Sequence, residues 1–253
     1  MPSSNPVFKT STFLDLGTGS VSQRYGGVMS LNGTINKTGI LVFLTALSAL
    51  FAWSHVLDSN GIPLPNIGAY ILGGSLGGFI FALITIFKKD WSPYTAPIYA
   101  VLEGLFLGAL SAIYEARFNG IVFQAVLLTF ATLAAMLLAY RSGMIRATEK
   151  FKMGVFAATG GIALFYLVTM LLRLFHVPVP IMNDSSPLSI ALSVIIVGVA
   201  ALNLILDFDS IEQGIAAGAP KYMEWYGAFG LIVTLVWLYL EFIRLLSKIQ
   251  SRN

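Results

Sequence analysis

The sequence contains no cysteine and only two histidines. Without cysteine the chain can form no disulfide, no thiolate nucleophile and no cysteine-ligated zinc or iron–sulfur centre. His55 and His176 are far apart, each near the end of an apolar run, so they form neither a metal-ligand cluster nor part of a Ser/His/Asp triad. The metalloprotease motif HExxH and the intramembrane-protease motif GxGD are also absent. We therefore expect no enzyme, no cofactor and no resident metal.

Charge is equally scarce. Only 11% of the 253 residues are charged, against roughly 25% in a typical soluble domain. Hydrophobic residues make up 57% of the chain, and the mean hydropathy is +0.80. A soluble fold of this length could not bury so much apolar surface, so the expected solvent is the lipid bilayer. The net charge of +3 comes without a basic tract, which argues against nucleic acid as a partner.

Apolar runs organise the chain after a polar beginning. Residues 1–36 are rich in Ser, Thr, Asn and Gly and lack the apolar core of a signal peptide, so we expect a mobile cytoplasmic tail. Residues 37–253 then form a single transmembrane domain, an all-α bundle of seven helices. The spans, each near the ~20 residues that a bilayer crossing needs, are predicted at 38–57, 68–87, 96–115, 121–140, 153–175, 188–207 and 225–246.

The loop cations predict the orientation. The tail and loops on the amino-terminal side of the membrane carry more Lys and Arg than the segments on the opposite side. This bias predicts that the amino terminus lies in the cytoplasm. The cations Arg244, Lys248 and Arg252 oppose this at the carboxyl end, and they leave open a last helix that re-enters instead of crossing. Glycines four residues apart favour close packing between helices; they occur at Gly73–Gly77, Gly74–Gly78, Gly104–Gly108 and Gly214–Gly218.

Carboxylates inside apolar runs are the candidates for function, because an ionised acid in lipid needs a partner, water or a proton. Glu103 lies near the middle of the third run, with Tyr99 one turn earlier as a possible hydrogen-bond partner. Glu241 lies past the centre of the last run. Its alternative interpretation is an ion pair with Arg244 three residues on.

Asp207 and Asp209 are two residues apart, hence about 200° apart around a helix. Asn203, Asp207 and Ser210 form one polar stripe, which predicts that Asp207 faces the bundle interior. Asp209 belongs to a second stripe with Glu212 and Gln213. The alternative is that both acids merely mark the end of the sixth helix, solvated or paired with loop lysines.

Most of the chain beyond the tail resembles the Bax inhibitor-1/YccA family, also called the transmembrane Bax inhibitor motif family, in its bacterial branch. The resemblance rests on TEKFKMGVFAATGGIALFYLV, ALNLILDFDSIEQG, KYMEWYGAFGLIVTLVWLYLEFIRLL and, earlier, WSPYTAPIYAVLEGLFLGALSAIYEA. It implies seven helices with the last at the centre. It also implies a pH-sensitive calcium leak channel linked to stress and cell death, or a regulator that binds a membrane-bound protease.

The family's pH sensor is a pair of acids on the sixth and seventh helices. The resemblance places them at Asp209, after Phe208, and at Glu241, after Leu240. Helical facing favours Asp207 instead, so Asp207 and Asp209 both remain candidates. Three departures are visible: glutamate replaces aspartate on the last helix, the segment between the acids is long, and a plain slab places the acids towards opposite leaflets. Either the sixth helix unwinds near Asp207, the last helix is shifted, or the pair is unconventional.

The expected function is therefore a calcium or cation leak, gated by protonation of Asp209 or Asp207 together with Glu241. Glu103 would line part of the path. We expect calcium as the permeant ion, with transient binding at Asp209 and Glu241, since hard cations prefer oxygen ligands. The alternative is a non-conducting regulator in the bacterial inner membrane that binds a membrane protein through its tail and the loop RSGMIRATEKFK.

Overall fold

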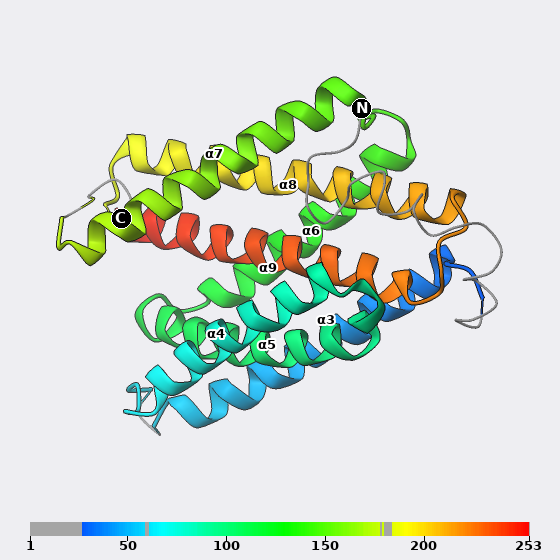
Figure 1. The fold of residues 1–253 in the computed structure, drawn as a ribbon. Helices are drawn as coiled ribbons and strands as arrows, with labels where there is room; N and C mark the ends of the chain where they lie inside the picture. Colours follow the sequence, from blue (N-terminus) through cyan, green and yellow to red (C-terminus); the bar gives the residue numbers. More distant parts are fainter. Residues whose placement is uncertain (1–26, 59–60, 178, 180–183, 253) are drawn as a thin grey trace. The chain divides into compact units, whose positions relative to one another are not determined.

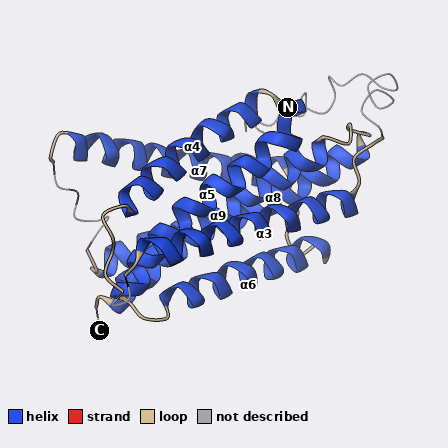
Figure 2. Cartoon of the chain, turned by 90° about the horizontal axis from the view of Figure 1, so that it is seen from below, coloured by secondary structure: helices blue, strands red, loops and turns tan. Residues whose placement is uncertain are grey.

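A computed structural model describes residues 27–58, 61–177, 179 and 184–252. In these residues Figure 1 and Figure 2 show helices and loops, and the helices long and apolar enough to cross a membrane number seven. They are α3 (Leu31–Val56), α4 (Ile67–Phe87), α5 (Ser92–Arg117), α6 (Ile121–Arg141), α7 (Glu149–Leu174), α8 (Pro187–Ala216) and α9 (Met223–Gln250). A short 3₁₀ turn, η1 (Lys89–Trp91), precedes α5. The all-α, seven-helix integral membrane fold is confirmed.

Several helices extend beyond the predicted spans. The first begins at Leu31 instead of residue 38, because Ser30 caps it by accepting a hydrogen bond from the backbone N–H of Gly33. The sixth continues to Ala216 instead of ending at residue 207. The tail predicted over residues 1–36 thus has its last six residues inside α3, while residues 1–26 lie outside the described part of the chain.

Gly218 sets the end of α8. Gly218 has a φ of +65°, the left-handed conformation that glycine adopts easily. Its N–H donates to the carbonyl of Ile215, and the N–H of Ala219 donates to the carbonyl of Gly214. This is the Schellman pattern that closes a helix. A Cβ at Gly218 would meet nothing within 4 Å, so this glycine serves the end of the helix and not a close helix–helix contact.

The chain forms two compact units. Unit 1 comprises residues 1–119 and 209–233, and unit 2 comprises residues 120–208 and 234–253. The division falls within α8 and within α9, so each of these helices contributes to both units. Of the seven helices in the described residues, α9 buries the largest share of its apolar window, 67%, against 11% for α7. The last helix is thus the interior helix, as predicted.

In unit 1, helix α5 packs closely against both α3 and α4. A Cβ added at Gly74 of α4 would lie 2.7 Å from the backbone oxygen of Leu102. A Cβ at Gly108 of α5 would lie 2.7 Å from the Cα of Ala49 on α3, and Gly104 meets the same helix one turn earlier. Two of the predicted glycine pairs, Gly74–Gly78 and Gly104–Gly108, therefore serve close internal packing.

A buried ion pair joins the start of α3 to the start of α9 in unit 1. Glu224 is 1% exposed and accepts hydrogen bonds from the N–H and Oγ of Ser30, at 3.0 and 2.9 Å, and from Nζ of Lys37 at 2.5 Å. The ammonium of Lys37 also lies 5.7 Å from the centre of the Trp225 ring. A Cβ at position 33 would overlap the Glu224 carboxylate, so a larger residue there would displace this acid.

Candidate functional site

The four acids singled out in the sequence lie on α5, α8 and α9, and they are divided between the units. Glu103 and Asp209 belong to unit 1, whereas Asp207 and Glu241 belong to unit 2. Each therefore has to be considered with the neighbours of its own unit.

Glu241 lies at the centre of a hydrogen-bonded cluster in unit 2. On α9, Trp237 and Arg244 lie one turn before and after it, on the same helix face. Trp237 Nε1 donates to its Oε1 at 3.2 Å, and Arg244 Nη1 lies 2.9 Å from both carboxylate oxygens. From α7, the hydroxyl of Tyr166 donates to Oε1 at 2.7 Å and accepts a hydrogen bond from Arg244. The Arg244 guanidinium lies 5.0 Å from the centre of the Tyr166 ring.

This cluster compensates the charge of Glu241 with the guanidinium of Arg244. The acid is 1% exposed, and a buried carboxylate is stable only when paired and hydrogen-bonded. The ion pair with Arg244 that the sequence offered as an alternative is therefore present. Tyr166, which lies in a mostly apolar stretch of α7, was not among the residues predicted from the sequence.

Asp207, also in unit 2, has a different environment. It is 5% exposed, so it faces the interior as the polar stripe predicted. Its carboxylate accepts a hydrogen bond from the hydroxyl of Thr234 on α9. Its Oδ2 is buried and has no hydrogen-bond partner within the described chain. One turn earlier on α8, Asn203 Nδ2 donates to Thr159 Oγ1 on α7 at 2.8 Å.

Asp207 and Glu241 do not form a carboxyl pair. In the part of the chain that is described, no hydrogen bond joins them, and their partners on α9 are Thr234 and Arg244. Thr234 precedes Glu241 by two turns, about 10 Å along the axis. Helix α8 is continuous through Asp207, so the unwinding considered as one alternative does not occur.

In unit 1, Asp209 is half-buried and accepts a hydrogen bond from Gln213 one turn later, at 2.5 Å. This bond follows the second polar stripe. Ser210 beside it is half-buried as well. Asp209 therefore has a local polar partner on its own helix.

Glu103 is half-buried against α4, where its Oε2 lies 2.7 Å from the position of a Cβ at Gly78. The glycine thus makes room for the carboxylate. Both Tyr99 and Glu103 are described, but no hydrogen bond joins them, contrary to the suggestion from sequence. The Tyr99 ring instead packs edge-on against Phe229 of α9, with ring centres 5.0 Å apart.

One sequence motif of enzymes occurs in the chain without the structure that the motif requires. Residues 73–77 read GGSLG, which fits the GxSxG motif of serine hydrolases. That motif requires a sharp turn from a strand into a helix. Here the pentapeptide lies inside α4, so Ser75 is an ordinary helical residue. Among the described residues, no three His, Cys, Asp or Glu side chains lie close enough together to hold a metal ion.

Comparison with known proteins gave one family. The model of the family described as Bax inhibitor 1 like matches residues 5–251, almost the whole chain. The searches of curated proteins and of solved structures gave no match.

Proposed function

The chain belongs to the Bax inhibitor 1-like family, and from this premise we propose that it is a pH-sensitive cation leak of the bilayer. Membership supports a membrane regulator or channel in general terms. Calcium as the permeant ion, gating by protonation of intramembrane carboxylates, and a place in the bacterial inner membrane with a cytoplasmic amino terminus are parts of our proposal.

The observation that supports it most is the carboxylate of Asp207. Its Oδ2 is buried with no hydrogen-bond partner in the described chain. An ionised carboxylate that lacks a counter-charge in an apolar helix bundle is costly. A bound proton or a passing cation removes that cost, and calcium prefers oxygen ligands of this kind. The two occupants would compete for the same oxygen, which makes flux depend on pH.

Glu241, Asp209 and Glu103 would contribute less to gating than Asp207. Glu241 would bind a cation or a proton only when Arg244 releases it. Asp209, which the family motif favours, and Glu103 are retained as further positions along the path. Single substitutions can distinguish the contributions of the four acids to the flux.

Substitution of Asp207 should remove the pH dependence of calcium flux. Asparagine keeps the shape of a protonated aspartate but cannot ionise. Liposomes that contain purified Asp207→Asn should therefore show the same flux at every pH from 6 to 8, equal to the wild-type flux at the acidic end. Asp209→Asn, Glu241→Gln and Glu103→Gln, measured in parallel, assign any remaining dependence.

Thr234→Val provides the matched control, because it removes the hydrogen bond to Asp207 without removing the titrating group. It should keep a pH-dependent flux, with an altered midpoint. A wild-type protein that is folded but conducts no calcium at any pH would contradict the leak. A pH profile unchanged in Asp207→Asn and lost in Glu103→Gln would move the sensor to α5.

A non-conducting regulator is the second candidate, and the connection between α6 and α7 favours it. Met144 is 81% exposed there, with exposed Arg141 and Arg146 on either side. An exposed methionine among cations is suited to contact with another protein. If this is the function, a membrane protease or another membrane protein should copurify stoichiometrically from native membranes. A Met144→Asp variant should lose that partner, while the matched loop change Ser142→Asp should retain it.

A further inference from the structure

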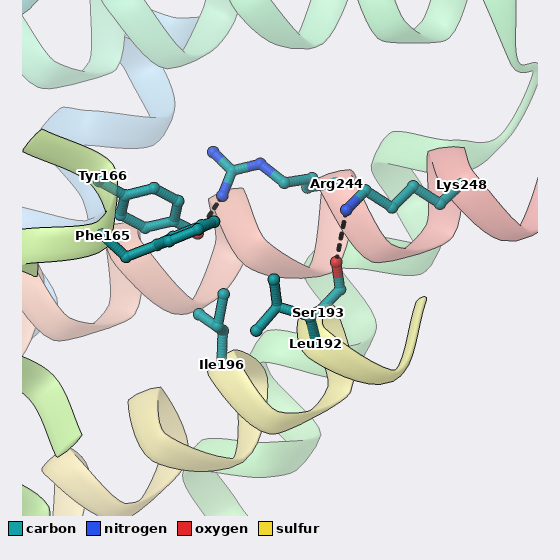
Figure 3. A pocket seen from close by; sticks show the side chains of 7 residues that line it. All are labelled: Phe165, Tyr166, Leu192, Ser193, Ile196, Arg244 and Lys248. Carbon is teal, nitrogen blue, oxygen red and sulfur yellow. Dashed lines mark hydrogen bonds between the residues drawn. The ribbon is translucent and has the colours of Figure 1, made fainter. Parts of the chain in front are cut away.

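A small pocket opens on unit 2 where α7, α8 and α9 meet (Figure 3). The empty space within it is about 200 Å³, part of which is open to the outside of the protein. Apolar side chains and side chains with polar groups both line it, and its residues are Phe165, Tyr166, Leu192, Ser193, Ile196, Arg244 and Lys248.

Both charged residues that line the pocket are cations. Lys248 is 5% exposed, and its Nζ donates to Ser193 Oγ at 2.9 Å and to the carbonyl of Ser189 at 3.4 Å. Arg244 makes all its hydrogen bonds to the described chain through Nη1. Its Nε and Nη2 therefore keep three N–H donors for another acceptor.

Two acids act on these cations from outside the lining. Glu241 forms an ion pair with Arg244, and Asp184 lies near enough to Lys248 to attract it. Neither acid lines the pocket. A ligand that enters from the open side therefore meets donors and positive charge first.

Polarity changes along the pocket in the direction of the membrane normal. Lys248 lies two residues, about 3 Å, before the end of α9, and Arg244 lies about 9 Å before it. Ile196 and Phe165 lie about 13 Å from the nearer ends of α8 and α7, so they are deeper in the bilayer. A phospholipid has the same order, with a charged phosphate near the surface and an acyl chain below it.

We propose that this pocket binds an anionic phospholipid, with its phosphate between Arg244 and Lys248 and an acyl chain against Phe165, Leu192 and Ile196. Basic pockets between transmembrane helices at a membrane surface commonly hold acidic headgroups. The two cations repel the positive headgroup of a zwitterionic lipid, while the apolar wall adds contacts that a soluble anion without an acyl chain does not make. This site does not depend on the proposed leak.

Native mass spectrometry of delipidated protein tests the site directly. The protein is titrated with phosphatidylglycerol and with phosphatidylcholine of identical acyl chains. We expect tighter binding of phosphatidylglycerol, and a loss of about fivefold in that preference for Lys248→Gln, the effect of one cation near a membrane surface. Arg252→Gln removes an exposed cation from the same end of the chain, outside the pocket, and should keep the preference.

A second variant covers the case in which Lys248→Gln does not fold. Leu192→Trp fills the apolar part of the pocket and keeps both cations, so it should weaken binding of both lipids. Equal binding of the two lipids by wild type, or equal losses in Lys248→Gln and Arg252→Gln, would overturn the proposal. So would displacement of the lipid by glycerol 3-phosphate at equal concentration, because the site would then recognise a soluble anion.

Discussion

Gly108→Ala should lower the stability of the protein by about 3 kcal/mol, although alanine is the better helix former. The added methyl group would overlap the backbone of Ala49 on α3, where neither helix has a side chain that could move aside. Overpacking of this kind costs typically 1–3 kcal/mol, and contact with backbone lies at the upper end. Thermal unfolding in detergent, followed by tryptophan fluorescence, measures the effect.

Gly73→Ala is the matched control. Gly73 is also a helical glycine in unit 1, but a Cβ there would meet nothing within 4 Å. Helix propensity alone then acts, so this variant should be unchanged or more stable by up to ~1 kcal/mol. Equal melting temperatures for Gly108→Ala and Gly73→Ala would contradict the close packing of α5 on α3.

Arg244→Met should cost a comparable 3–5 kcal/mol for a different reason. The substitution leaves the Glu241 carboxyl buried without its counter-charge, with the hydroxyl of Tyr166 and the ring N–H of Trp237 as its remaining partners. The stability of the double variant Glu241→Gln/Arg244→Met should return most of the way to wild type, because no charge is then left unpaired.

Arg252→Met controls for the loss of a cation as such. Arg252 is exposed, and exposed charges contribute little to stability. The melting temperature of Arg252→Met should therefore stay close to that of the wild type. If the double variant were no more stable than Arg244→Met alone, the cost would come from lost packing of the arginine stem and not from an uncompensated acid.

Sequence predicted the seven helices because an apolar run of about 20 residues is a local signal. The same signal missed the start of α3 and the end of α8 by several residues, because it stops where the apolar run stops while the helix continues. Ser30 extends α3 through a polar stretch by capping it, and the Gly218 motif carries α8 to Ala216. Both caps are readable in the sequence, but apolar length alone does not use them.

The candidate site was predictable only in its local parts. The three-residue spacing of Glu241 and Arg244 suggested their ion pair, and the four-residue spacing of Asn203 and Asp207 suggested a common face. Contacts between distant segments of the chain produce no comparable spacing pattern in the sequence. Tyr166 reaches Glu241 across 75 residues of sequence, and no periodicity reports that contact.

The division of the chain has a consequence for its synthesis. Unit 1 needs residues 209–233, and its ion pair joins Lys37 to Glu224 across 187 positions. Unit 2 needs residues 234–253. Domains usually fold one after another as the chain emerges, but here neither unit has all its residues until α9 is made. The first six helices must therefore wait in the bilayer while Lys37 and Tyr166 lack their partners on α9, and we expect a chain truncated before α9 to be less stable than the complete one.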